Sequence, residues 1–160
     1  MSRYADDLRL RAVQPALEQL GLWSLAAETL VLATAAHESG GFLYREQRGG
    51  GPALGLWQIE PDTHDDLYFN YLDYRPELRA KLITLKTTPG ADDLDAELRD
   101  NDVYAAGVCR LIYKRHPAPL PSDPADIEAM AALWKRVYNT ALGKGTVQQF
   151  ISDYERHVLA

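Results

Sequence analysis

Apolar positions along the chain recur at the spacing of a helix, and no stretch alternates in the way that is typical of a strand. The first run spans about residues 4–20 and contains four such positions: Leu8, Val13, Leu17 and Leu20. Pro15 lies inside this run, and because proline lacks an amide hydrogen, we expect it to kink or split the helix. Gly21 is typical of the residue that follows a helix end.

The second run is apolar on nearly every side. Residues 30–36 read Leu-Val-Leu-Ala-Thr-Ala-Ala and lead directly into His37 and Glu38. Ser24 is a residue of the type that caps a helix start, and the glycines at 40 and 41 end the run. A helix that is apolar all round is covered on most sides. The pattern therefore predicts a central helix that ends in a carboxylate.

Helical spacing also predicts the remaining elements. These are about 61–75, 76–86, 92–115 with an interruption near 100–101, 124–139 capped by Asp123, and a last helix toward Leu159. Thr146 and Gln149 form a capping box before the last helix. The proline-rich stretch 117–121 is a linker. The chain is thus expected to be mainly α, one domain over 1–160 of about seven to nine helices, with at most a small hairpin within 47–58.

Composition narrows the function classes. The chain has 160 residues, enough to bury a core, and a net charge of −6, which argues against nucleic acid as a partner. Its single cysteine, Cys109, excludes an internal disulfide, and no apolar run is long enough to cross a membrane. The charged N-terminus has no secretory signal pattern. His37 has no second histidine at metal-ligand spacing, so we expect no metal or cofactor, and we expect a monomer.

The candidate chemistry lies between Glu38 and Thr63. A glycine-rich loop centred on 49–51 follows the carboxylate, and the chain resumes order at Ala53-Leu54-Gly55-Leu56-Trp57-Gln58-Ile59-Glu60-Pro61. A carboxylic acid can protonate a glycosidic oxygen at neutral pH only if its pKa is raised. Burial at the end of an apolar helix raises the pKa, and the negative end of the helix dipole acts in the same direction. The alternative is an ordinary solvated glutamate.

Three segments together carry a family resemblance. Glu38-Ser39-Gly40-Gly41-Phe42, followed by Gly55-Leu56-Trp57-Gln58 with Pro61 and Thr63, resembles the pattern of soluble lytic transglycosylases in the lysozyme-like superfamily. Residues 102–107 and 137–141 resemble two later helical segments of that family, in the same order. Trp57 stands where the family usually has Met, and the glycine of its late segment is displaced to Gly143. The short, acidic chain is also similar to phage-encoded muralytic proteins, either endolysins or virion-associated enzymes.

The resemblance implies a lysozyme-like fold and cleavage of the bond between N-acetylmuramic acid and N-acetylglucosamine in bacterial peptidoglycan. Glu38 would be the acid and then the base. Hydrolysis needs a second carboxylate, at a separation of about 5 to 9.5 Å depending on the stereochemistry, whereas transglycosylation uses the 6-hydroxyl of the muramic acid itself. Glu60 is the first candidate for this second carboxylate, ahead of Glu46 and Asp62, although its position before Pro61 also suits a helix start. The sequence leaves both reactions open.

Five further residues are expected to bind substrate. The set is Ser39, Trp57, Gln58, Tyr138 and Asn139. Gln58 would donate to an N-acetyl or hydroxyl group, and the Tyr138 hydroxyl would orient Glu38 or a sugar. Trp57 would either stack on a sugar or fill the core, and Ser39 would either bond the catalytic carboxylate or end the helix.

The expected setting follows from the same resemblance. The protein would be made in the cytoplasm of the producing, infected cell and would act on peptidoglycan after release, or it would be carried in a virion. The competing hypothesis is a catalytically inactive glycan-binding or structural virion protein that keeps the cleft. The two hypotheses differ in what Glu38→Gln does, because only an enzyme loses its role with that change.

Overall fold

Helices provide the regular structure of the computed structural model, which describes residues 1–87, 93–139 and 143–160. No strand occurs within those ranges, which confirms the predicted mainly α fold of seven to nine helices. In chain order the helices are α1 (Arg3–Leu8), α2 (Gln14–Gln19), α3 (Leu25–Glu38), α4 (Pro61–Asn70), α5 (Pro76–Ile83), α6 (Leu94–Asp100), α7 (Asp102–Arg115), α8 (Ile127–Trp134) and α9 (Val147–Tyr154).

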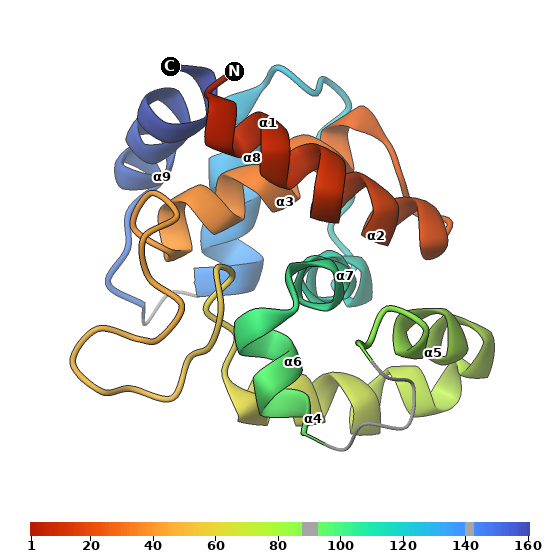
Figure 1. Ribbon diagram of the computed structural model, residues 1–160. Helices are drawn as coiled ribbons and strands as arrows, with labels where there is room; N and C mark the ends of the chain where they lie inside the picture. The colour runs from red at the N-terminus through yellow and green to blue at the C-terminus, as the bar shows by residue number, and fades with distance from the viewer. Residues whose placement is uncertain (88–92, 140–142) are drawn as a thin grey trace.

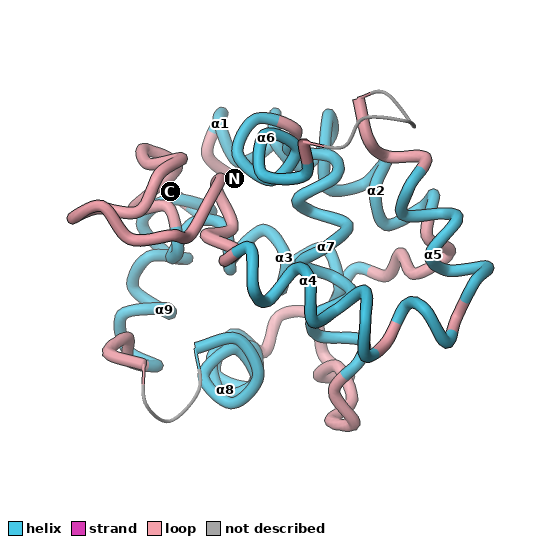
Figure 2. The backbone as a smooth tube through the Cα atoms, turned by 90° about the horizontal axis from the view of Figure 1, so that it is seen from below, coloured by secondary structure: helices cyan, strands magenta, loops and turns pink. Residues whose placement is uncertain are grey.

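Helices α3 and α7 lie in the middle of the molecule. Nine of the fourteen residues of α3 are buried, as its all-round apolar pattern predicted, and Ser24 caps it by accepting a bond from the Ala27 amide at 3.0 Å. Helices α8 and α9 lie on one side of this pair and α5 on the other, and α1 and α2 run across α3 (Figures 1 and 2). One hydrophobic cluster runs through all of these elements.

The interruption expected at Pro15 takes the form of a π-helical segment, Arg9–Val13, immediately before it. Proline cannot donate to the preceding turn, and a widened turn accommodates the missing bond without breaking the helix. The interruption expected near Asp100 is also present, because Asn101 ends α6 and caps α7. The expected start at Asp92 lies outside the described residues.

The predicted start of the late helix is wrong. Asp123 does not cap it; its carboxylate accepts a bond from the Ala125 amide at 2.9 Å in a local turn. The helix begins at Ile127, and Asp126 caps it by accepting from the Ala129 amide at 3.0 Å. Two aspartates of the same capping type stand three residues apart, and the sequence pattern alone chose the wrong one.

The long loop between α3 and α4 has no strand, although two isolated antiparallel bridges join Glu46 to Leu54 and Leu54 to Ile59. The hairpin is therefore reduced to single pairings. Gly55 allows the tightest of these turns, because it has a φ of 77° and a Cβ there would lie 2.0 Å from the Leu98 carbonyl oxygen. The loop is thus held against the end of α6.

Charged side chains attach the same loop to α7 and to the first helical run. Asp102, whose side chain is only 4% exposed, accepts bonds from Arg45 at 2.7 and 3.0 Å and from Arg11 at 2.8 Å. The two ends of the described chain lie side by side, since the Ser2 amide donates to the Val158 carbonyl at 2.6 Å (Figure 1). Among the described residues, no helix has the length and apolar character needed to cross a bilayer.

Candidate active site

Glu38 is the last residue of α3, and its side chain is 18% exposed. The Trp134 indole, at the end of α8, donates a hydrogen bond to Glu38 Oε2 at 3.1 Å. Burial raises the pKa of Glu38 from 4.5 to about 7, and the indole bond opposes the rise by stabilising the charged form. The carboxyl is therefore about half protonated at neutral pH, as a general acid requires.

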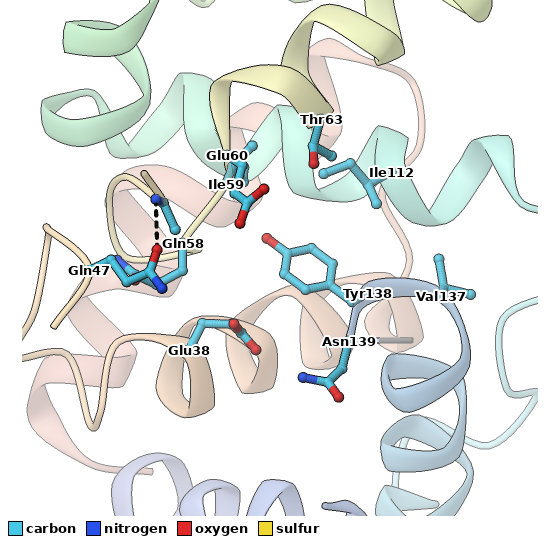
Figure 3. Close-up of a pocket in the computed structure, with 11 residues that line it drawn as sticks. Glu38, Gln47, Gln58, Ile59, Glu60, Thr63, Ile112, Val137, Tyr138 and Asn139 are labelled. Atoms are coloured by element: carbon cyan, nitrogen blue, oxygen red, sulfur yellow. Dashed lines mark hydrogen bonds between the residues drawn. The ribbon is translucent and has the colours of Figure 1, made fainter. Parts of the chain in front are cut away.

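A cavity of about 490 Å³ opens beside this carboxyl. Its walls come from the loop before α4, from the start of α4, and from the π-helical segment Lys135–Asn139 that continues α8. Figure 3 shows Glu38, Gln58, Glu60 and Tyr138 gathered around it. A hollow of this size holds a small-molecule or saccharide unit. We call it the Glu38 cavity.

Glu60 lies at the other side of the Glu38 cavity from Glu38 (Figure 3). It is exposed and takes the position before α4, but its side chain makes no capping bond there. The other two candidates for a second carboxylate do not line the Glu38 cavity. Glu46 lines a separate hollow beside Arg99, and Asp62 is an exposed residue in the first turn of α4. Glu60 is therefore the carboxylate that shares the cavity with Glu38.

Gln58 lines the cavity through a turn of unusual backbone geometry. Its φ is 48°, a left-handed value, and its side-chain amide nitrogen donates to the Gly55 carbonyl at 2.9 Å. That bond uses one of its two amide hydrogens, and the second hydrogen and the amide oxygen are left for a ligand. The turn thus presents a fixed amide at the cavity wall, where the sequence pattern predicted a donor.

Tyr138 also lines the cavity, but its hydroxyl has a different partner from the one expected. It donates to the Trp57 carbonyl oxygen rather than to Glu38, and its ring stacks on Tyr113 with centroids 5.5 Å apart. Burial raises the pKa of Tyr138 well above its ordinary value, so the hydroxyl keeps its proton. Tyr138 therefore joins the late helix to the Trp57 turn.

Asn139 faces the cavity from the same segment. Its amide oxygen accepts a bond from the Lys135 ammonium at 2.7 Å, and that ammonium also donates to the carbonyls of Gly143 and Gly145 at 2.9 and 2.8 Å. The oxygen is thereby fixed, and the amide nitrogen points toward the Glu38 side of the cavity (Figure 3). Residues 140–141 of the late motif lie outside the described residues.

Two of the predicted substrate-binding residues are corrected by the structure. Trp57 is fully buried, and its indole donates to the Val31 carbonyl at 2.9 Å, so it fills the core beneath the cavity. Ser39 is also fully buried; its hydroxyl donates to the Ala35 carbonyl at 2.6 Å and accepts from the Phe42 amide at 2.7 Å. Neither residue lines the Glu38 cavity. For both residues, the structural alternative was the right one.

Sequence reasoning missed Trp134 and the pair formed by His37 and Asp153. His37 Nδ1 lies 2.7 Å from Asp153 Oδ2, its Nε2 lies 3.9 Å from Glu38 Oε2, and its ring packs edge-on against Trp134. In the sequence Trp134 is one more apolar position of the late helix, and nothing in the pattern pairs it with residue 38. The signal for Asp153 is equally weak, because it is an acidic residue on an amphipathic helix, where a solvated side chain is the ordinary expectation.

A second hollow, of about 750 Å³, adjoins the first. Glu38 and Asn139 line both hollows, and α9 supplies the far wall of the second through Gln148, Ser152 and Asp153. The Glu38 carboxyl therefore stands between two openings. A chain-like ligand crossing Glu38 would enter both of them.

Among the described residues, no three histidine, cysteine or acidic side chains come together in an arrangement that could hold a metal ion. What the geometry offers is one carboxyl with a raised pKa, a second carboxylate across the cavity, and two fixed amides. Comparison with protein-family models, with curated proteins and with solved structures finds no match to this chain. The resemblance to lytic transglycosylases therefore rests on the sequence motifs.

Proposed function

We propose that this chain cleaves the glycan strand of bacterial peptidoglycan at the bond between N-acetylmuramic acid and N-acetylglucosamine. The observation that carries the proposal is the Glu38 carboxyl, whose burial raises its pKa to about 7 at the edge of a cavity of about 490 Å³. Such a group has both protonation states available near pH 7, and the cavity is large enough for a sugar.

Each step uses a group of this chain. Protonated Glu38 gives its proton to the glycosidic oxygen as the bond to the sugar carbon breaks, and the resulting carboxylate then removes a proton from the attacking group. The Trp134 indole stabilises that carboxylate at 3.1 Å. The Gln58 and Asn139 amides at the cavity wall would hold acetamido or hydroxyl groups of the sugars.

The attacking group is either water or the 6-hydroxyl of the muramic acid. Water needs activation, and the exposed Glu60 carboxylate in the same cavity supports this hydrolytic version. Attack by the 6-hydroxyl needs no second carboxylate and produces an anhydro sugar. The two versions make different products from the same first step.

Digestion of purified sacculi followed by mass spectrometry of the fragments tests the proposal. Anhydro ends, lighter by one water, identify transglycosylation, and reducing ends identify hydrolysis. Glu38→Gln is expected to lower turnover by at least about a hundredfold while its circular dichroism spectrum stays that of the wild type, because the amide cannot donate the proton. Glu60→Gln should reduce hydrolysis comparably and leave transglycosylation intact.

Glu46→Gln is the matched control, because it removes an exposed carboxylate from the same loop without touching the Glu38 cavity. Its turnover should equal that of the wild type. If sacculi bind the protein but no fragments form at any pH from 4 to 9, turnover is refuted and the protein is a glycan-binding module. Activity that survives Glu38→Gln would remove Glu38 from the mechanism.

A further inference from the structure

The hollow on the α9 side of Glu38 is lined by two arginines that form no ion pair among the described residues. Arg48, from the loop after α3, and Arg156, from the π-helical segment Glu155–Leu159, both line it. Among the described residues, neither has an acidic group within ion-pair distance. We call this space the arginine hollow.

Of the two acidic groups that line the arginine hollow, Glu38 is bonded to the Trp134 indole and Asp153 faces two histidines. Asp153 lies 2.7 Å from His37 Nδ1 and 4.0 Å from His157 Nε2, so two imidazoles surround it. The lining also includes Gln148 and Ser152, which are exposed on one face of α9. In a chain of net charge −6, two exposed guanidinium groups without acidic partners make this hollow locally attractive to an anion.

The position of the arginine hollow limits what that anion can be attached to. It shares Glu38 and Asn139 with the Glu38 cavity, so its occupant is continuous with whatever lies across Glu38. A glycan of muramic acid and glucosamine carries its anionic groups on the lactyl arm of the muramic acid. The arm ends in its own carboxylate when bare, and in the carboxylates of a peptide when one is attached.

We propose that the arginine hollow binds the carboxylate carried by this lactyl arm, with Arg48 and Arg156 as its two cationic contacts. The inference rests on the proposed function, because it names the part of the substrate that lies beyond the bond being cut. Guanidinium groups pair with carboxylates in a planar, two-bond geometry, and the two arginines come from separate elements that face one hollow. They would select strands with a charged arm over strands without one.

Calorimetric titration of three oligosaccharides into Glu38→Gln tests the proposal, since that variant keeps the ligand intact. The first ligand is an N-acetylglucosamine oligomer without carboxylates, the second a peptide-free muramyl glycan with bare lactyl carboxylates, and the third the same glycan with its stem peptides. Adding Arg48→Gln and Arg156→Gln together should weaken binding of the carboxylate-bearing ligands by about tenfold. Binding of the uncharged oligomer should not change.

The pair Arg75→Gln and Arg136→Gln, in the same background, is the matched control. Arg75 lies 4.4 Å over the Tyr71 ring, as Arg48 lies 4.5 Å over the Tyr44 ring, and Arg136, like Arg156, has no ion pair among the described residues. The control removes the same charge away from the hollow, so all three affinities should stay those of the background. An effect on only one of the charged ligands supports the proposal and identifies the source of the carboxylate.

Two results overturn the inference. In the first, the ligands still bind, but the arginine changes weaken all three equally or none of them. The arginine hollow then does not bind a carboxylate, and the proposed function stands. If none of the three ligands binds, the proposed function falls together with the inference. Raising the salt concentration should reduce the difference between charged and uncharged ligands, because the contacts are exposed.

Discussion

At the scale of single residues, the proton affinity of Glu38 is the property on which the proposed chemistry depends. Its side chain stands at the end of an apolar helix with one indole as its bonded partner. Burial disfavours the charged form more than the indole favours it, so the pKa rises to about 7. A group whose pKa is raised by folding has a measurable effect on stability that does not depend on any substrate.

Glu38→Gln is therefore expected to become the more stable form as the pH rises. The native state binds the proton more tightly than the unfolded state, so the stability of the wild type is full below pH 4.5 and falls as the pH rises to about 7. The glutamine variant does not lose stability in this way. Between pH 4 and pH 8, its free energy of unfolding relative to that of the wild type should therefore rise by about 3 kcal/mol. Urea unfolding at a series of pH values measures it. A constant difference would mean that the pKa is not raised.

The sequence predicted that Glu38 ends a buried helix, because a long apolar run ends there and glycines follow at once. It could not say which neighbours face that carboxylate. Trp57 and Ser39 belong to the motif but point into the core, whereas Trp134, distant in sequence, bonds the acid. A helical pattern gives the face on which a side chain lies and leaves its partner on another helix open.

At the scale of elements, the turn from Gly55 to Gln58 sets the cavity wall. Gly55 has a left-handed backbone and lies against the end of α6, while the Tyr138 hydroxyl holds the Trp57 carbonyl from the other side. The turn is therefore clamped between two helices that are far apart in the chain. Its geometry, more than its side chains, fixes where the Gln58 amide stands.

Gly55→Ala should destabilise the protein by about 3 kcal/mol or more. The alanine Cβ would lie 2.0 Å from the Leu98 carbonyl oxygen, which is backbone and can only move with α6, and the φ of 77° adds strain. Gly49→Ala is the control, since its φ is 84° but nothing lies within 4 Å of the added carbon. Its cost should be about 1 kcal/mol. Equal costs in chemical denaturation would refute the close contact.

Element types followed from the sequence more reliably than element ends. The capping box at Thr146 and Gln149 formed as expected, because both of its bonds join residues only three positions apart. The late helix began at Ile127 instead of Pro124, because Asp123 and Asp126 offer the same capping chemistry. Packing against the core decides between two local signals of equal strength, and that packing is not visible in a local pattern.

At the scale of the whole molecule, one carboxylate joins three distant parts of the chain. Asp102, at the start of α7, receives Arg11 from the first helical run and Arg45 from the long loop. Burial opposes its charged form, but the hydrogen bonds from Arg45 and Arg11 outweigh burial and lower its pKa. This network holds the loop that carries Arg48 and Gln58. No local sequence pattern predicts it, because Arg45 and Arg11 precede Asp102 by 57 and 91 positions.

Asp102→Asn should cost about 2 to 3 kcal/mol of stability at neutral pH, because two guanidinium groups lose their shared anion. The pKa of Asp102 is lowered on folding, so its contribution is present above the ordinary value of 3.8 and is lost as the pH falls below it. Thermal denaturation at pH 7 and at pH 3 should show the variant approaching the wild type at the lower pH. A penalty independent of pH would assign the loss to packing.

Asp7→Asn is the matched control for this change. Asp7 pairs with the same Arg11 at 2.8 Å, but its side chain is 62% exposed. Exposed ion pairs contribute little, so the cost should stay below about 0.5 kcal/mol. A similar cost for both substitutions would indicate that Asp102 is an ordinary surface pair rather than the centre of a network.

Because the Trp134 indole bonds Glu38, the proposed chemistry depends on how α8 packs against α3. If α8 were displaced, water would reach the carboxyl, and Glu38 would lose its proton at neutral pH as an ordinary glutamate does. Heating that displaces α8 would therefore abolish the proposed chemistry. The raised pKa of Glu38 thus depends on a helix that lies almost a hundred positions away in the chain.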